Sequence, residues 1–309
     1  MLKLKSMRSL ILLCFVLSFI SCNTMETKSE IAVVEDVAET PKSKFSVNKD
    51  FRDYWYAGEA EITSYKLEQE RYGELRDGTA VLVYVTEDFL PDVQVKADNN
   101  NTSNVSVLKL NATKKFNTGI YPYSIMQSTF YPVSNNQHAL KITCSVQEWC
   151  GQVYAQLNNR SKFEIMSHSY FEGEADRSYS LTKTWTENEL WTKLRIDPKS
   201  MPTGELSIIP SFEFTRLKHK TIEAYNAIAS LDTNTYTITY PALNRTLKIN
   251  FQESFPYEIL GWEETTLIGY GSSPSTMTTK AIKLETLKTA YWQKNSNADS
   301  NLREKLKLD

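Results

Sequence analysis

Residues 114–157 constrain the fold more than any other part of the chain, because short β-forming runs alternate there with turn residues. Residues 125–131 and 138–146 are rich in β-branched and aromatic side chains, which favour extended strands. The residues between the runs are ones that favour turns: Asn117-Thr118-Gly119, Pro122, Pro132 and Asn135-Asn136. This alternation predicts adjacent antiparallel strands, and nothing in it is typical of an active site.

The same alternation continues through the rest of the chain beyond residue 51. We expect further strands at residues 59–67, 79–86, 105–110, 162–166, 179–184, 211–217, 233–240, 245–251 and 257–262. Residues 80–85 are continuously apolar, which indicates a strand buried on both faces, and residues 73–78 supply the turn before it. With no internal repeat, the pattern predicts one all-β, mainly antiparallel domain whose twisted sheet curls into a barrel or half-barrel.

One helix is expected within this β-body, at residues 187–194. Thr186 and Glu189 have the spacing of a capping box, and apolar residues follow at helical spacing. Pro198 ends the pattern. A shorter helical pattern lies at residues 302–306, so the predicted fold contains one or two short helices.

The first 22 residues predict export and lipid attachment. Three basic residues precede the apolar run 10–19, which is too short to span a membrane and is typical of a secretory signal peptide. A cysteine at the end of this run, Cys22, is typical of bacterial lipoproteins, which carry a lipid on that residue. The alternative is an ordinary signal peptide with an incidental cysteine.

The chain therefore divides into a signal peptide at residues 1–21, a lipidated Cys22 with a flexible tether at 22–50, and a single β-rich domain at 51–309 with a polar C-terminal tail. The tether has few apolar residues and many Glu, Lys, Thr and Ser, so it buries too little surface to fold. The protein would then lie in the cell envelope, anchored through its lipid to the outer membrane. With 35 Lys and Arg against 37 Asp and Glu, the chain has no basic excess suited to nucleic acid.

Residues 58–89, 114–126, 138–141, 147–151 and 189–198 resemble a family of Bacteroidota lipoproteins that are sometimes labelled "septum formation inhibitor Maf". The resemblance extends from Tyr54 to about Trp292. It implies a lipoprotein without established catalytic residues. True Maf proteins are cytosolic nucleotide pyrophosphatases with a Ser- and Arg-rich phosphate-binding motif near the N-terminus, and that motif is missing from this sequence. The label therefore implies no activity.

Cys144 and Cys150 allow three interpretations. A hairpin turning near Gln147 would place them opposite each other, and a disulfide is stable in an oxidising envelope. They are otherwise two free thiols. In the third interpretation Cys150 is a nucleophile activated by His168 or His219, which only the fold would bring near.

The sequence predicts no cofactor and no metal site. The three histidines lack zinc-ligand spacing, and residues 172–176, Glu-Gly-Glu-Ala-Asp, fit a solvated acidic turn better than a calcium loop. Two functions follow. One is a non-enzymatic envelope module that binds an apolar ligand, a glycan or an envelope protein; the other is an envelope hydrolase that uses Cys150 with a histidine.

Overall fold

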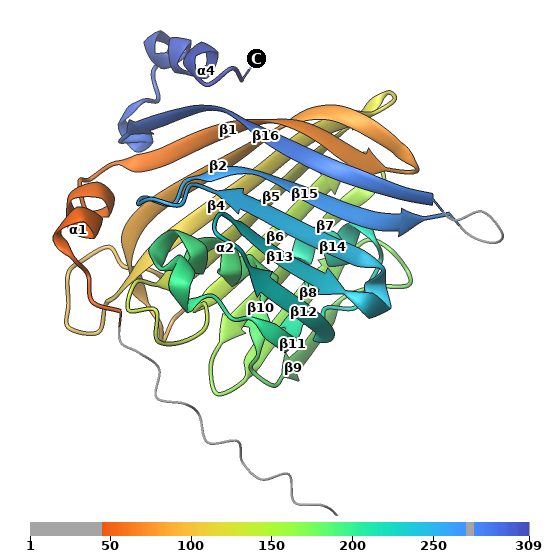
Figure 1. The fold of residues 1–309 in the computed structure, drawn as a ribbon, viewed down its shortest axis with the longest axis horizontal. Helices are drawn as coiled ribbons and strands as arrows, with labels where there is room; N and C mark the ends of the chain where they lie inside the picture. Colours follow the sequence, from red (N-terminus) through yellow and green to blue (C-terminus); the bar gives the residue numbers. More distant parts are fainter. Residues whose placement is uncertain (1–44, 270–274, 309) are drawn as a thin grey trace, which may run out of the picture. The chain divides into compact units, whose positions relative to one another are not determined.

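The computed structural model describes residues 45–269 and 275–308. The predicted signal peptide, Cys22 and the predicted tether up to residue 44 lie outside this part of the chain. One sheet of sixteen strands dominates the described residues, and all its pairings are antiparallel except that of β10 with β11 (Figure 1). The predicted all-β, mainly antiparallel fold is confirmed.

The strands are β1 (Ala60–Arg71), β2 (Glu74–Leu90), β3 (Val95–Lys96), β4 (Val105–Thr118), β5 (Tyr121–Pro132), β6 (Lys141–Glu148), β7 (Gly151–Asn159), β8 (Phe163–Ser169), β9 (Arg177–Leu181), β10 (Trp185–Thr186), β11 (Gly204–Ile209), β12 (Tyr225–Leu231), β13 (Thr235–Tyr240), β14 (Arg245–Phe251), β15 (Ile259–Ile268) and β16 (Ser275–Thr289). The α-helices are α1 (Lys49–Trp55), α2 (Glu187–Ile196), α3 (Phe212–Leu217) and α4 (Asn301–Lys305). Short 3₁₀ turns lie at Pro198–Ser200, Pro241–Leu243, Tyr291–Gln293 and Asn297–Asp299. The described chain thus holds four short α-helices, where the sequence predicted one or two.

The sheet curls around α2, because this helix contacts strands that are far apart in the strand order. Asn188 of α2 donates a hydrogen bond to Gln127 of β5 at 2.9 Å, and Arg245 of β14 donates one to Glu187 at 2.8 Å. Five strands separate β14 from β5 in the sheet. The order begins at β10 and ends at β9, and no pairing joins these two edges within the described residues. The sheet is therefore an open half-barrel with α2 inside its curve (Figure 1).

The hairpin between β1 and β2 turns earlier than the sequence predicted. Its two-residue turn is Tyr72-Gly73, with φ of 57° and 77°, the left-handed values that a tight hairpin requires. Gly78, expected in the turn, lies inside β2 opposite Phe116. A Cβ on Gly78 would lie 2.3 Å from the carbonyl oxygen of Lys115, so glycine permits the close approach of β2 and β4.

The predicted strand at residues 211–217 is wrong, because this segment forms α3. Ser211 is the N-cap, and its hydroxyl accepts a hydrogen bond from the backbone N–H of Phe214 at 3.2 Å. All six residues of α3 are buried, whereas a half-buried strand would alternate between buried and exposed residues. The helix predicted at 187–194 is confirmed as α2, with both hydrogen bonds of the Thr186–Glu189 capping box.

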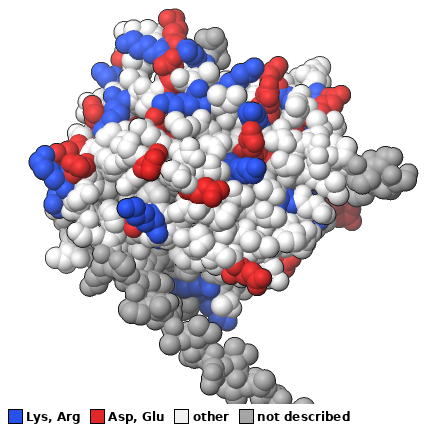
Figure 2. All heavy atoms as spheres, viewed as in Figure 1, with Lys and Arg blue, Asp and Glu red and all other residues white. Residues whose placement is uncertain are grey.

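Residues 45–50, at the end of the predicted tether, pack on the β-body. The ring of Phe45 lies 5.4 Å from that of Phe51, and Asn48 caps α1 by accepting a hydrogen bond from the Phe51 N–H at 2.8 Å. On the face of the molecule in Figure 2, Lys and Arg side chains are interspersed with Asp and Glu, and neither sign gathers into one patch. Among the residues that the structure describes, no helix has both the length and the apolar character to cross a bilayer.

Candidate functional site

Helix α2 has no face toward solvent, because it lies in the lumen of the half-barrel. Its buried residues are Glu187, Asn188, Glu189, Leu190, Thr192, Lys193, Leu194, Arg195 and Ile196. A charged side chain in such a place is tolerated only when a partner of opposite charge or several hydrogen bonds compensate for its lost hydration. The polar partners of α2 therefore define the chemistry of the lumen.

Arg195 joins the C-terminal turn of α2 to β1 through a bidentate pair with Glu61. The two guanidinium nitrogens donate to the carboxylate at 2.6 and 2.7 Å, and both side chains are 1 % exposed. The guanidinium also lies 5.0 Å from the ring centre of Trp55 and 4.6 Å from that of Tyr84. Burial alone would raise the pKa of Glu61, but the Arg195 charge and its hydrogen bonds outweigh burial and hold that pKa below its usual value.

Arg245 joins the N-terminal turn of α2 to the opposite arm of the sheet. Both of its terminal nitrogens donate to the Glu187 carboxylate, and its Nε donates to Glu264 of β15 at 3.1 Å. The Tyr240 hydroxyl donates a further hydrogen bond to Glu187 at 2.9 Å. Burial works to raise the pKa of Glu264, but the charge of Arg245 outweighs it and lowers that pKa.

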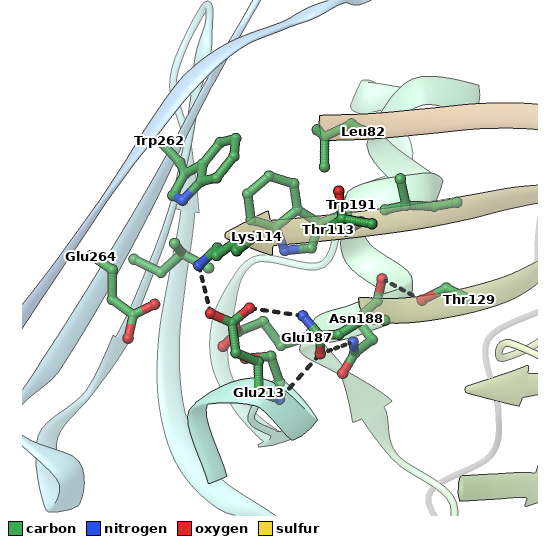
Figure 3. A pocket seen from close by; sticks show the side chains of 15 residues that line it. Leu82, Thr113, Lys114, Thr129, Glu187, Asn188, Trp191, Glu213, Trp262 and Glu264 are labelled. Atoms are coloured by element: carbon green, nitrogen blue, oxygen red, sulfur yellow. Dashed lines mark hydrogen bonds and ion pairs between the residues drawn. The ribbon is translucent and has the colours of Figure 1, made fainter. Parts of the chain in front are cut away.

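A cavity of about 50 Å³ lies between α2, α3 and the two arms of the sheet (Figure 3). It is lined by Leu82, Leu110, Ala112, Thr113, Lys114, Gln127, Thr129, Glu187, Asn188, Trp191, Ser211, Glu213, Leu247, Trp262 and Glu264. Lys114 of β4 and Glu213 of α3 point toward each other across it and form an ion pair of 2.7 Å (Figure 3). The Lys114 ammonium lies 5.7 Å from the ring centre of Trp262, which meets Trp191 edge-on at 5.3 Å.

The charges around this cavity do not balance. Among the lining residues, Glu187, Glu213 and Glu264 supply three carboxylates and Lys114 supplies one ammonium group, while Arg245, outside the lining, pairs with Glu187 and Glu264. Burial raises the pKa of Glu213, the neighbouring carboxylates add to this, and Lys114 offsets only part of it. The surroundings of Glu213 therefore favour its protonated form more than those of an exposed glutamate would.

A small space adjoins the cavity and shares lining residues with it. Glu213 and Glu264 also line a space of about 10 Å³, together with Glu70 and Lys218. Glu70 and Lys218, which form an ion pair, in turn line an open cleft of about 530 Å³ at the end of the sheet. The Glu70–Lys218 pair thus borders both the small space and the cleft.

The structure separates the two cysteines that the sequence offered as a disulfide. Cys144 lies in β6, is 3 % exposed and pairs with Ala155 of β7, whereas Cys150 lies exposed in the turn between these strands. The predicted turn near Gln147 falls two residues later, so the side chains do not face each other and both thiols are free. Burial raises the pKa of Cys144, and a hydrogen bond with the Glu148 side chain raises the pKa of Cys150.

The three histidines contact carboxylates and not Cys150. His138 lies 2.8 Å from Glu189, the ring of His168 lies 3.2 Å from Asp176, and that of His219 lies 2.7 Å from Glu174. The thiol–imidazole pair that a cysteine hydrolase requires is therefore not assembled by His168 or His219.

Residues 172–176 form the expected solvated acidic turn, in which only Glu174 is partly buried. Besides His219, Glu174 accepts hydrogen bonds from Ser169 at 2.7 Å and Arg216 at 3.3 Å. Within residues 45–269 and 275–308, no group of three or more His, Cys, Asp and Glu side chains is arranged to hold a metal ion.

Sequence reasoning missed every charged residue of the cavity. Lys114 and Glu264 each interrupt the apolar pattern of a strand, and such an interruption is the signal that marks an inward-facing polar side chain. Glu213 was assigned to a strand, and the Ser211 cap was the signal that would have placed it on a helix.

No family model and no curated protein matches this chain. Among solved structures it is similar to a β-barrel-like protein of the domain of unknown function DUF1849 from Brucella abortus, with 6% identity and a TM-score of 0.36 over 74% of this chain and 97% of that one. It is also similar to a porin-like protein from Bacteroides uniformis, with 10% identity and a TM-score of 0.24 over 72% of this chain and 95% of that one. At these TM-scores the likenesses carry no inference about function.

Proposed function

We propose that the protein is a lipid-anchored lipoprotein of the cell envelope whose half-barrel binds a small organic cation without converting it. The observation that carries this proposal is a cavity lined by three carboxylates, two of which share the Arg245 guanidinium, and walled by Trp191 and Trp262. Because Glu187 and Glu264 share the one guanidinium of Arg245, an incoming ammonium group would gain both Coulombic and hydrogen-bonding energy there.

The lining also suits the rest of such a ligand. Leu82, Leu110 and Leu247 offer apolar surface for an alkyl group, and a cation over a tryptophan face gains about 0.5–2 kcal/mol. Lys114 already places an ammonium group beside Trp262 and Glu213, which supports the view that these side chains suit an ammonium ligand. The space beside Lys114 corresponds to a few water molecules, so the smallest alkylammonium ions fit best.

Binding without catalysis is the better-supported function because the catalytic alternative lacks its geometry. Cys150 is exposed, its pKa is raised by Glu148, and His168 and His219 are held by carboxylates. The lumen also disfavours a large apolar ligand, since α2 and α3 fill it and leave a cavity of only about 50 Å³.

Ligand binding is tested by titrating the full mature protein at pH 8 with methylammonium, ethylammonium and butylammonium chloride, at ionic strength matched with NaCl. A ligand at a hundred times its dissociation constant stabilises the native state by about 2.7 kcal/mol, which a thermal unfolding curve detects. Glu213→Gln should abolish the shift, whereas Glu253→Gln, an exposed glutamate outside the cavity, should keep it. An equal shift with NaCl, or an unchanged shift in Glu213→Gln, would contradict the proposal.

Anchoring through Cys22 has a separate test, supported by the basic and apolar segments that precede this cysteine. In cells, Cys22→Ser should lose both incorporation of labelled fatty acid and recovery in the outer-membrane fraction. Cys14→Ser, within the apolar segment, is the matched control and should keep both. Membrane recovery and labelling that persist in Cys22→Ser would refute the anchor.

A further inference from the structure

The open cleft at one end of the sheet is large enough to hold a ligand of its own. Its volume of about 530 Å³ falls within the range of small-molecule sites. The cleft lies between the β1–β2 turn at Tyr72, the β13–β14 turn at Asn244 and the segment that follows α3. Strands β1 and β13 run in the same direction, since four antiparallel steps separate them, so both turns lie at the same end.

Aromatic side chains continue from this cleft along the neighbouring hairpin turns. Tyr72, 58 % exposed, donates or accepts a hydrogen bond with the buried Tyr123 hydroxyl at 2.9 Å. The ring of Tyr123 lies 6.0 Å from that of Tyr121, which in turn stacks on Trp149 at 6.3 Å with an angle of 30° between the planes. Trp149 is 68 % exposed, so the row begins and ends in a solvent-exposed ring, with the buried Tyr123 behind it.

The cleft also carries an excess of positive charge. Arg71, Lys218 and Lys220 line it against the single carboxylate of Glu70, which Lys218 already pairs. Arg71 is fixed by hydrogen bonds to the Tyr123 hydroxyl and to the backbone carbonyl of Leu217. Lys220 is exposed and forms no ion pair with any residue that the structure describes.

We propose that this cleft and its aromatic row bind an acidic oligosaccharide. Sugar rings present C–H faces that stack on tyrosine and tryptophan, and their hydroxyls bond to phenols such as Tyr72. A uronic acid carboxylate would pair with Lys220. An anionic membrane surface would attract the same residue types, but a flat surface does not enter a concave cleft, which favours a discrete chain of sugars.

The test uses the full mature protein and isothermal calorimetry with tetragalacturonate, maltotetraose and phosphatidylglycerol vesicles. We expect tetragalacturonate to bind, and maltotetraose, which lacks the carboxylates, to bind at least tenfold more weakly. Lys220→Gln should weaken tetragalacturonate binding about tenfold, as expected for the loss of one charged hydrogen bond. The control Lys199→Gln removes an exposed lysine that does not line the cleft and should leave binding unchanged.

A second pair of variants tests the aromatic contribution without relying on one substitution that could disturb folding. Tyr72→Leu should weaken binding about tenfold, while Tyr72→Phe, which keeps the ring, should retain most of it. Equal binding of maltotetraose, binding of vesicles alone, or no binding of any probe would each overturn the proposal. Glu213→Gln changes the interior cavity and not the cleft, so this variant should bind tetragalacturonate normally. The oligosaccharide proposal can therefore succeed or fail independently of the proposed cation site.

Discussion

The buried pair between Arg195 and Glu61 should be the strongest single attachment of α2 to the sheet, and Glu61→Gln tests this directly. The substitution keeps the size of the side chain but removes the charge that two guanidinium nitrogens contact at 2.6 and 2.7 Å. Arg195 stays protonated at any working pH, because Glu61 raises its pKa despite burial, so it would remain charged without a carboxylate partner.

The expected loss follows from that unpaired charge. Removing one partner of a fully buried ion pair costs about 3–5 kcal/mol, a large part of the 5–15 kcal/mol that stabilises a typical domain. Adding Arg195→Met should recover much of this loss, since the remaining guanidinium is then replaced by an apolar side chain between Trp55 and Tyr84. The double variant should therefore be more stable than Glu61→Gln alone.

Urea unfolding followed by circular dichroism measures the free energy of unfolding of the single and the double variant. The variants are compared only if this free energy falls with urea concentration at the same slope in each. Glu263→Gln is the matched control, because it breaks an exposed pair with Lys280 on the same sheet and should cost less than about 1 kcal/mol. A loss below about 1 kcal/mol in Glu61→Gln, or additive losses in the double variant, would refute the reasoning.

The same pair predicts a pH dependence of stability. Because the pKa of Glu61 is lower in the folded state than in the unfolded state, its contribution is present above the ordinary glutamate pKa. It is lost as the pH falls through the lowered value. The difference in unfolding free energy between the wild type and Glu61→Gln should therefore shrink in acid.

Three further predictions follow from local contacts. A chain beginning at residue 45 should unfold in urea like the mature protein. A chain beginning at Lys49 loses the Asn48 cap and the Phe45 contact, so its free energy of unfolding should be about 1–3 kcal/mol lower. Equal stability of the two chains would contradict the packing of residues 45–48. Cys150 should react slowly with iodoacetamide at pH 7 and faster in Glu148→Gln, because that change removes the carboxylate whose hydrogen bond raises the Cys150 pKa. Cys144, which is buried, should react only on unfolding. Equal reaction rates of the two thiols, measured by mass spectrometry, would disprove this. Gly78→Ala should cost about 1–3 kcal/mol because its Cβ meets the Lys115 carbonyl, whereas Gly173→Ala, with open space around it, should cost less than about 0.5 kcal/mol.

Local patterns in the sequence were sufficient to predict the fold class and helix α2. Strand runs between turn residues depend on neighbouring residues alone, as does the Thr186–Glu189 capping box, so both are visible without knowledge of the tertiary contacts. The same approach failed for α3, whose residues are all buried: without a polar face, periodicity does not separate a short helix from a strand, and the Ser211 cap decides the outcome.

Tertiary structure alone decided the candidate site and the state of the cysteines. Lys114, Glu187, Glu213 and Glu264 come from four elements spread over 150 residues, and only the curl of the sheet around α2 and α3 brings their charges into one cavity. A turn two residues later than expected was enough to point Cys144 into the core and leave Cys150 in solvent, because cross-strand partners depend on register. Sequence patterns indicate most of the segments that become strands, whereas the register and curvature of the sheet determine which side chains meet.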